Sequence, residues 1–79
     1  MSSTQASPNL YYNSSIDPQL RANIAPGLHV AIVLKKDQPT GILTYGIVQA
    51  VLTSAAHHPR GIKVRLASGD VGRVQAVYV

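Results

Sequence analysis

Residues 61–77 read GIKVRLASGDVGRVQAV, two alternating runs of apolar and polar residues on either side of Ser68-Gly69-Asp70. Alternation with a period of two indicates strands that bury one face, and glycine between serine and aspartate is typical of a tight turn. The stretch therefore predicts a β-hairpin with strands over residues 62–66 and 71–77.

The register of this hairpin depends on which residues must be buried. A two-residue loop would pair Val64 with Arg73 and bring a cation to the core face. A three-residue loop over residues 68–70 pairs Val64 with Val74 instead and keeps the core apolar. We therefore expect the second register, in which Arg65 faces Arg73 on the outer side.

The chain before the hairpin predicts two more strands. Residues 28–35 alternate strictly, as expected of a half-buried strand. Residues 42–53 are rich in β-formers but apolar on both faces, and a bend near Gly46 would let each half face a different side of a small barrel. The segments 35–41 and 54–60 are polar, contain proline, and predict exposed loops.

Four strands in roughly fifty residues predict an all-β fold. The expected architecture is a small SH3-like barrel of four to five strands, because curling reduces exposed edges. We assign this barrel to residues 24–79. Residues 1–23 are expected to form a flexible tail, in which Asp17-Pro18 offers an N-cap and predicts at most a short helical turn. We expect one end of the barrel to be covered by Ile16, Leu20 and Ile24.

Size and composition limit the function. A chain of 79 residues has room for one domain, and a deep catalytic cavity is hard to fit into it. The sequence has no cysteine, which excludes disulfides and thiolate sites. It also has no apolar run long enough to span a bilayer and no secretory signal pattern. We therefore expect an intracellular protein, cytoplasmic or nuclear, with no membrane partner.

No motif predicts catalysis or metal binding. Gly41 and Gly46 have phosphate-loop spacing, but Ile47 follows where lysine is required. The adjacent histidines His57 and His58 have neither a thiolate nor a nearby carboxylate to complete a zinc site. The three aspartates fall in predicted loops or at a cap. We therefore expect no enzyme, no catalytic residues, no metal site and no cofactor.

The distribution of cations is the strongest functional signal. Lysine and arginine number 7 against 3 acidic residues, giving a formal net charge of +4 and a pI near 9.9. Such an excess favours a polyanionic partner, although exposed cations can also be a solvated surface. The candidate nucleic-acid-binding residues are Lys35, Lys36, His57, His58, Arg60, Lys63, Arg65 and Arg73.

Aromatic residues are scarce in the predicted barrel. Only Tyr45 and Tyr78 lie within it, so recognition of backbone or shape is favoured over the reading of single bases. The tail carries the pair Tyr11-Tyr12, which can be mobile, stack on a base or dock on the barrel.

Residues 23–77 resemble the YwbE family of small uncharacterised proteins. The likeness is carried by KKDQ (35–38), Gly41-x-Leu43-Thr44-x-Gly46-x-Val48, Leu52-Thr53, His58-Pro59, GIKVRL (61–66) and Gly69-x-Val71-Gly72-Arg73-Val74. The strand-loop-Gly-x-Val pattern is also similar to the KOW motif of ribosomal and transcription-associated SH3-like barrels. That similarity implies a KOW-like barrel in contact with RNA or the ribosome, by analogy of fold.

These observations lead to a non-catalytic nucleic-acid-binding module, with RNA or a ribonucleoprotein as the expected partner. The rival hypothesis is a protein–protein interaction adaptor, because SH3-like barrels also bind peptides. The scarcity of aromatics disfavours a proline-peptide groove but permits a flat adaptor surface. The sequence does not define the oligomeric state.

Overall fold

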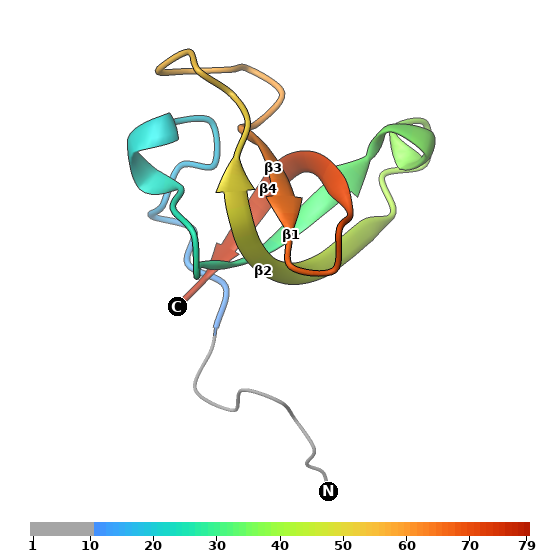
Figure 1. Cartoon of the computed structure of the whole chain (residues 1–79), viewed down its shortest axis with the longest axis horizontal. Coiled ribbons are helices and arrows are strands. Elements are labelled where there is room, and N and C mark those ends of the chain that lie inside the picture. Colours follow the sequence, from blue (N-terminus) through green and yellow to red (C-terminus); the bar gives the residue numbers. More distant parts are fainter. Residues whose placement is uncertain (1–10) are drawn as a thin grey trace, which may run out of the picture.

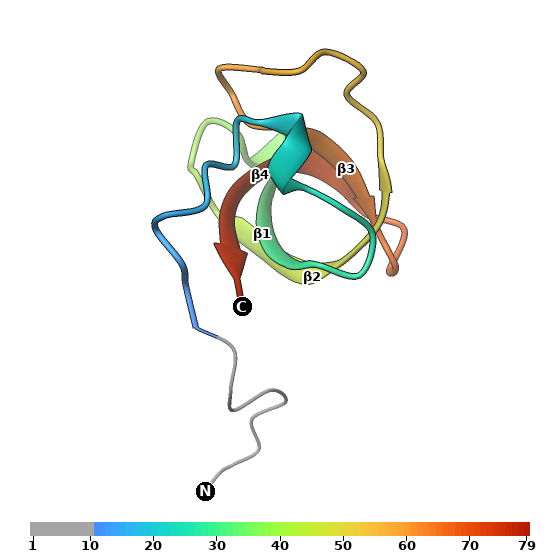
Figure 2. The same ribbon diagram turned by 90° about the vertical axis from the view of Figure 1, so that its left-hand side faces the viewer.

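Four antiparallel strands close into a barrel over residues 11–79, the part of the chain that the computed structural model describes (Figure 1). They are β1 (His29–Leu34), β2 (Leu43–Val51), β3 (Lys63–Leu66) and β4 (Val71–Tyr78). Each strand pairs with the next, and β4 pairs back with β1, so the strands curl around one axis (Figure 2). The predicted all-β, SH3-like barrel is confirmed.

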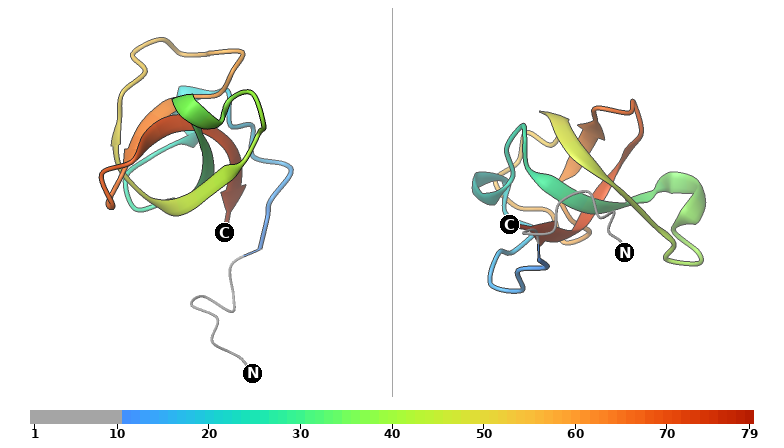
Figure 3. Two further views of the ribbon diagram at one scale, coloured as in Figure 1. Left: turned by 90° about the vertical axis from the view of Figure 1, so that its right-hand side faces the viewer. Right: turned by 90° about the horizontal axis from the view of Figure 1, so that it is seen from below.

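Two short 3₁₀ turns flank β1. The turn η2 (Arg21–Asn23) precedes it and η3 (Lys35–Asp37) follows it, and they lie at opposite ends of the barrel (Figure 3). η2 is the short helical turn that the sequence predicts, but it begins later than Asp17. The Asp17 carboxylate accepts a hydrogen bond from the Gln19 amide at 2.8 Å and so stabilises a turn ahead of η2.

The core is apolar throughout. Because side chains alternate along a strand, each strand turns one face into the barrel. All the buried apolar residues lie within residues 24–79, the segment assigned to the barrel. The described chain buries no polar or charged side chain. The core cluster consists of Ile24, Val30, Ile32, Val48, Ile62, Val64, Leu66, Val74 and Val77.

The long strand β2 pairs with two neighbouring strands, β1 and β3. Its first half, Leu43 to Ile47, pairs with β1, and its second half, from Val48 onward, pairs with β3 after a register shift. At Gly46 a Cβ atom would lie 2.8 Å from Leu66 Cδ1, so a side chain there would displace the core. The two halves of β2 therefore pair with different neighbours, and the irregularity in this pairing lies between Val48 and Ala50, while the bend near Gly46 stays a prediction.

Closure of the barrel depends on β1 and β4. A bulge interrupts their pairing, because Ala31 pairs with Ala76 whereas Ile32 pairs with Val74, which leaves Gln75 as an extra residue on β4. Val74 and Val77 are therefore both buried, although strict alternation would put them on opposite faces.

The loop between β3 and β4 consists of residues 67–69. The Leu66 amide donates to the Asp70 carbonyl at 2.8 Å, and the Gly69 amide donates back to the Leu66 carbonyl at 2.8 Å. Gly69 has a φ of 95°, the left-handed conformation that the last residue of a three-residue hairpin loop requires. In the predicted loop over residues 68–70, Asp70 would be the last residue and would have to adopt the left-handed conformation.

The hairpin register differs from the prediction for this reason. Val64 pairs with Gly72, so the predicted pairing of Val64 with Val74 is wrong by two residues. Arg65 lies opposite Val71, and the predicted pairing with Arg73 is wrong as well. A shift of two residues keeps each side chain on its expected face, and both valines are still buried.

The segment before η2 runs along the barrel. Tyr11 and Val79 exchange two backbone hydrogen bonds of 3.0 Å, and Pro18 accepts one from the Ile62 amide at 3.0 Å. Of the predicted tail, residues 1–10 lie outside the described residues, and the domain boundary between residues 23 and 24 stays a prediction. The part of the chain from residue 11 onward contains no helix with the length and apolarity needed to cross a membrane.

The three residues expected to cover one end of the barrel divide into two groups. Ile24 is buried and Ile16 packs partly buried against the core. Leu20 remains 39% exposed and forms an isolated bridge with His57 instead. The expectation for Leu20 is therefore wrong, because its backbone is extended and pairs with the loop after β2.

Replacing Gly72 by alanine should lower the free energy of unfolding by about 2 kcal/mol or more, because overpacking at a strand contact cannot be relieved by a flexible side chain. The added Cβ atom would lie 2.4 Å from the Val33 carbonyl oxygen of β1. Urea unfolding followed by circular dichroism measures the change. The comparison variant is Gly69→Asn, where nothing lies within 4 Å of the added Cβ atom, so its cost is limited to the left-handed backbone, which asparagine tolerates better than most residues. It should destabilise the protein less than Gly72→Ala. Equal stability of Gly72→Ala and the parent would contradict so close an approach of β1 and β4.

Candidate nucleic-acid interface

The outer faces of β3 and β4 bring cations together. Lys63 pairs directly with Arg73, and Arg65 lies two residues further along β3. Lys63 and Arg65 are exposed, whereas Arg73 is half-buried. Like charges directly opposite each other on a sheet repel, so the Lys63–Arg73 pair favours a bound anion.

Neutral oxygen atoms hold the Arg73 side chain in place. Its Nη1 donates to Thr53 Oγ1 and to the Gly61 carbonyl oxygen, both at 3.4 Å. A guanidinium has five N–H donors, so this arrangement fixes the group and leaves other donors for a ligand. Because both acceptors are uncharged, the positive charge of Arg73 is not compensated by them.

Thr53 organises this region from the end of β2. Its hydroxyl also accepts a hydrogen bond from the Lys63 amide at 2.7 Å, and its carbonyl accepts one from Arg21 Nε at 2.8 Å. The sequence prediction missed both Thr53 and Arg21, since Arg21 falls in the segment assigned to the tail. Only the tertiary pairing of that segment with the loop after β2 brings Arg21 here.

Arg60 and the histidines belong to the loop between β2 and β3. Arg60 is exposed, and its amide donates to His58 Nδ1 at 3.1 Å, which holds the imidazole against the turn. His57 is turned toward the N-terminal segment, where its Nε2 lies 3.3 Å from Gln19 Oε1. The structure therefore brings His58 toward the arginines and ties His57 to a different neighbour.

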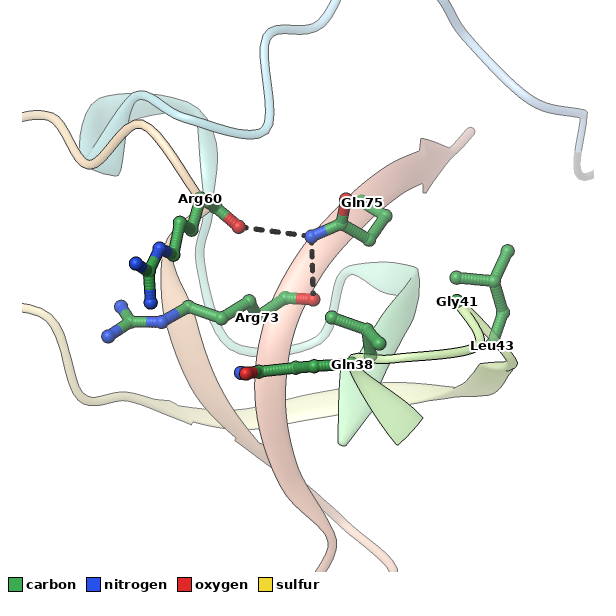
Figure 4. Close-up of a pocket in the computed structure, with 7 residues that line it drawn as sticks. Gln38, Gly41, Leu43, Arg60, Arg73 and Gln75 are labelled. Carbon is green, nitrogen blue, oxygen red and sulfur yellow. Dashed lines mark hydrogen bonds between the residues drawn. The ribbon is translucent and has the colours of Figure 1, made fainter. Parts of the chain in front are cut away.

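An open pocket of about 540 Å³ adjoins these cations. Arg60 and Arg73 extend to the same side of it, while Gln75 Nε2 donates to the Arg60 and Arg73 carbonyl oxygens at 3.0 and 3.4 Å (Figure 4). The lining residues are Val33, Gln38, Gly41, Leu43, Arg60, Arg73 and Gln75. Two guanidinium groups beside polar amides can bind an anion such as a phosphate.

Lys35 and Lys36 lie on η3, both exposed. The same loop contributes Gln38 and Gly41 to the pocket, so these lysines are close in sequence to its rim. We define the basic face as Arg60, Lys63, Arg65 and Arg73, the cations that β3, β4 and the preceding loop present together. Lys35 and Lys36 flank it from the loop after β1.

The environment of His58 lowers the pKa of its imidazole. Desolvation is the largest cause, and the positive charges of Arg73, Arg60 and His57 follow. The neutral imidazole also suits the geometry, because Nδ1 accepts a hydrogen bond from the Arg60 amide. A bound phosphate would oppose this effect by favouring the protonated ring.

Comparison with known proteins places the chain in a family. Residues 17–77 match the family described as "Uncharacterized conserved protein (DUF2196)". The chain belongs to this family. It is also 54% identical over 59 residues to "Uncharacterized protein YwbE" of Bacillus subtilis (strain 168), covering 75% of this chain and 91% of that protein. No solved structure gives a significant match.

Membership of DUF2196 confirms the resemblance to the YwbE family. The family match begins at Asp17, six residues before the stretch on which the resemblance was based. The segment that carries Arg21 is thus part of the family domain. Within residues 11–79 no three metal-ligating side chains gather into a cluster, and the absence of a bound metal stays a prediction for this DUF2196 protein.

The lowered pKa of His58 predicts a pH-dependent stability. The folded state disfavours protonation of His58 relative to the unfolded state, whose pKa is about 6.5. Between the two pKa values the unfolded state binds more protons, so the free energy of unfolding should fall as the pH drops from 6.5 through the folded value. Urea unfolding at a series of pH values measures this decline.

The matched variant is His58→Asn, because an asparagine oxygen can accept the Arg60 amide two residues on without titrating. This variant should lose part of the acid-induced decline while it keeps the turn. An identical pH profile for parent and variant would show that His58 does not link folding to pH.

Proposed function

We propose that this protein is a non-catalytic RNA-binding module that contacts phosphates through its basic face. The observation that carries the proposal is the position of the Arg73 guanidinium and its lack of a negatively charged acceptor in the described hydrogen bonds. Arg73 faces Lys63 across the sheet, and its guanidinium is held by neutral acceptors on Thr53 and Gly61. A preorganised and uncompensated cation of this kind suits a phosphate, because less side-chain entropy is lost on binding.

Several features support a polymer as the partner instead of a single small anion. The cations extend from the pocket at Arg60 across Lys63 to Arg65, so they can contact successive phosphates. The net charge of +4 would draw a polyanion from a distance. RNA is favoured over DNA by the KOW-like character of the barrel, which is an argument from fold. An RNA partner would also agree with an intracellular location.

A protein-interaction adaptor remains the second candidate. The observation that favours it is the apolar outer side of β2, where Leu43, Tyr45 and Ile47 are 37%, 66% and 41% exposed. Exposed apolar side chains in one strand can form a contact with another protein. Capture from a cell extract separates the two candidates. A partner released by nuclease supports RNA, whereas one retained after nuclease treatment and insensitive to salt supports the adaptor.

Replacing Arg60, Lys63 and Arg65 together by glutamine should weaken binding to single-stranded RNA on the order of a hundred-fold at moderate salt, because three phosphate contacts are lost. The slope of log affinity against log salt concentration should flatten by about 2 units. Fluorescence anisotropy with a labelled oligonucleotide, repeated at several salt concentrations, measures both quantities. Folding should be little affected, since all three side chains are exposed.

Arg73 is left intact in this variant because it is half-buried and hydrogen-bonded, so its replacement would disturb the fold as well as binding. The matched control exchanges the cations with their charge retained, as Arg60→Lys, Lys63→Arg and Arg65→Lys. This control should keep the parental salt slope. If the glutamine variant binds with the parental affinity and slope, the basic face is a solvated surface and the proposal is wrong.

A further inference from the structure

Three tyrosines from distant parts of the sequence meet on the outside of the barrel. The ring of Tyr78, at the end of β4, lies 6.0 Å from that of Tyr12 and 6.0 Å from that of Tyr45, measured between centroids. The ring of Tyr12 is tilted by 58° to that of Tyr78, and the ring of Tyr45 makes an edge-to-face pair with it at 61°, a geometry that aromatic pairs prefer. We call Tyr12, Tyr45 and Tyr78 the tyrosine cluster.

Strand pairing explains how the cluster forms. β1 lies between β2 and β4, and Tyr45 pairs with Ala31 while Tyr78 pairs with His29 two residues away. The two rings therefore occupy diagonal positions across β1, within reach of each other over a small residue. Tyr12 joins them because the N-terminal segment pairs with the end of β4 and forms a bridge with Tyr78.

Two of the three rings of the tyrosine cluster are largely exposed to solvent. Tyr12 and Tyr45 are 59% and 66% exposed, although each ring contacts Tyr78. Desolvation, followed by the neighbouring phenols of Tyr45 and Tyr12, raises the pKa of Tyr78. Within residues 11–79 the rings of Tyr12 and Tyr45 thus present exposed faces on which another flat group can stack.

The tyrosine cluster and the basic face share the outer side of β4, which carries both Tyr78 and Arg73. On β1, Tyr78 pairs with His29 and Arg73 pairs with Val33, four residues further along, which is about 13 Å at the usual rise of a strand. The bulge at Gln75 is what turns both Tyr78 and Arg73 outward, since Tyr78 lies five positions after Arg73 and strict alternation would put an odd step on opposite faces. Aromatic rings and cations side by side match the alternating bases and phosphates of a single strand.

We propose that the tyrosine cluster is a stacking platform for the bases of single-stranded RNA whose phosphates contact Arg60 and Arg73, an inference that rests on the proposed RNA-binding function. Stacking on tyrosine is tolerant of sequence, because every base offers a flat face. It needs unpaired bases, so the platform should select single strands over duplexes. By sequence, only Tyr45 and Tyr78 count as aromatic residues of the barrel, and Tyr12 joins them through the pairing of the N-terminal segment with β4.

Intrinsic fluorescence provides a direct test, since the chain has 4 tyrosines and no tryptophan. Bases stacked on the cluster should quench the tyrosine emission when the full chain is titrated with a short oligouridylate. Inorganic polyphosphate, which carries the charge without bases, should bind with little quenching. Equal quenching by both ligands would overturn the platform.

Variants of Tyr45 measure its contribution to affinity. Tyr45→Leu should weaken binding of the oligouridylate roughly five-fold to a hundred-fold, the usual effect of losing one stacked base. The salt slope should be unchanged, because no phosphate contact is lost. Tyr45→Phe should bind like the parent, and so should the control Tyr11→Leu, whose side chain is 70% exposed and lies outside the cluster. Circular dichroism confirms that each variant is folded.

The outcomes separate this inference from the proposed function. If Tyr45→Leu binds the oligouridylate as tightly as the parent, with a steep salt slope in both, the platform is wrong while phosphate binding stands. If the parent binds neither the oligouridylate nor a duplex at low salt, both proposals are wrong. If a protein partner is captured through this surface in that case, the tyrosines belong to a protein-binding site and the adaptor hypothesis is supported.

Discussion

The pairing of β4 with β1 is the constraint on which the rest of this structure depends. It closes the barrel, so every strand has a neighbouring strand on each side. It succeeds because Gly72 has no side chain to meet the Val33 carbonyl, and because the bulge between Ala31 and Ile32 takes up one residue of β4. The closed sheet then sets the neighbours of every outward-facing side chain, including Arg73 beside Lys63.

The sequence was sufficient for those features that depend on local patterns. Alternation predicted β1, β3 and β4, the content of β-forming residues predicted β2, and polar segments predicted the loops. The bulge that turns Val77 into the core was not predicted. The hairpin register was missed because the choice between loop positions rested on burial alone, whereas the left-handed conformation of Gly69 decides it. Among the candidate site residues, the outward-facing cations of β3 and β4, Lys63, Arg65 and Arg73, could be predicted from the sequence. The contributions of Thr53, Arg21 and Gln75 required the tertiary contacts of their loops.

The division between an apolar core and a charged surface explains how the fold tolerates uncompensated cations. Nine buried apolar residues form the core, and no buried polar group depends on an ion pair. Repulsion between Lys63 and Arg73 takes place at the surface, where solvent and salt weaken it to a small fraction of the stability gained from burial. The charges are therefore not needed to hold the barrel together, and their arrangement is free to suit a ligand.

Gln75 links the architecture to the surface chemistry. In a regular strand Arg73 and Tyr78 would point to opposite faces, since side chains alternate and five positions separate them. The bulge inserts one residue, which brings both to the outside while Val74 and Val77 enter the core. Bulges leave backbone groups unpaired, and the Gln75 side chain compensates locally by donating to the Val74 carbonyl at 3.2 Å. The same Nε2 also donates to the Arg60 carbonyl at 3.0 Å. The bulged residue that changes the facing of the side chains in β4 therefore also holds the loop that carries Arg60, a cation of the basic face. A single irregularity in β4 thus gives the barrel both its cationic and its aromatic surface.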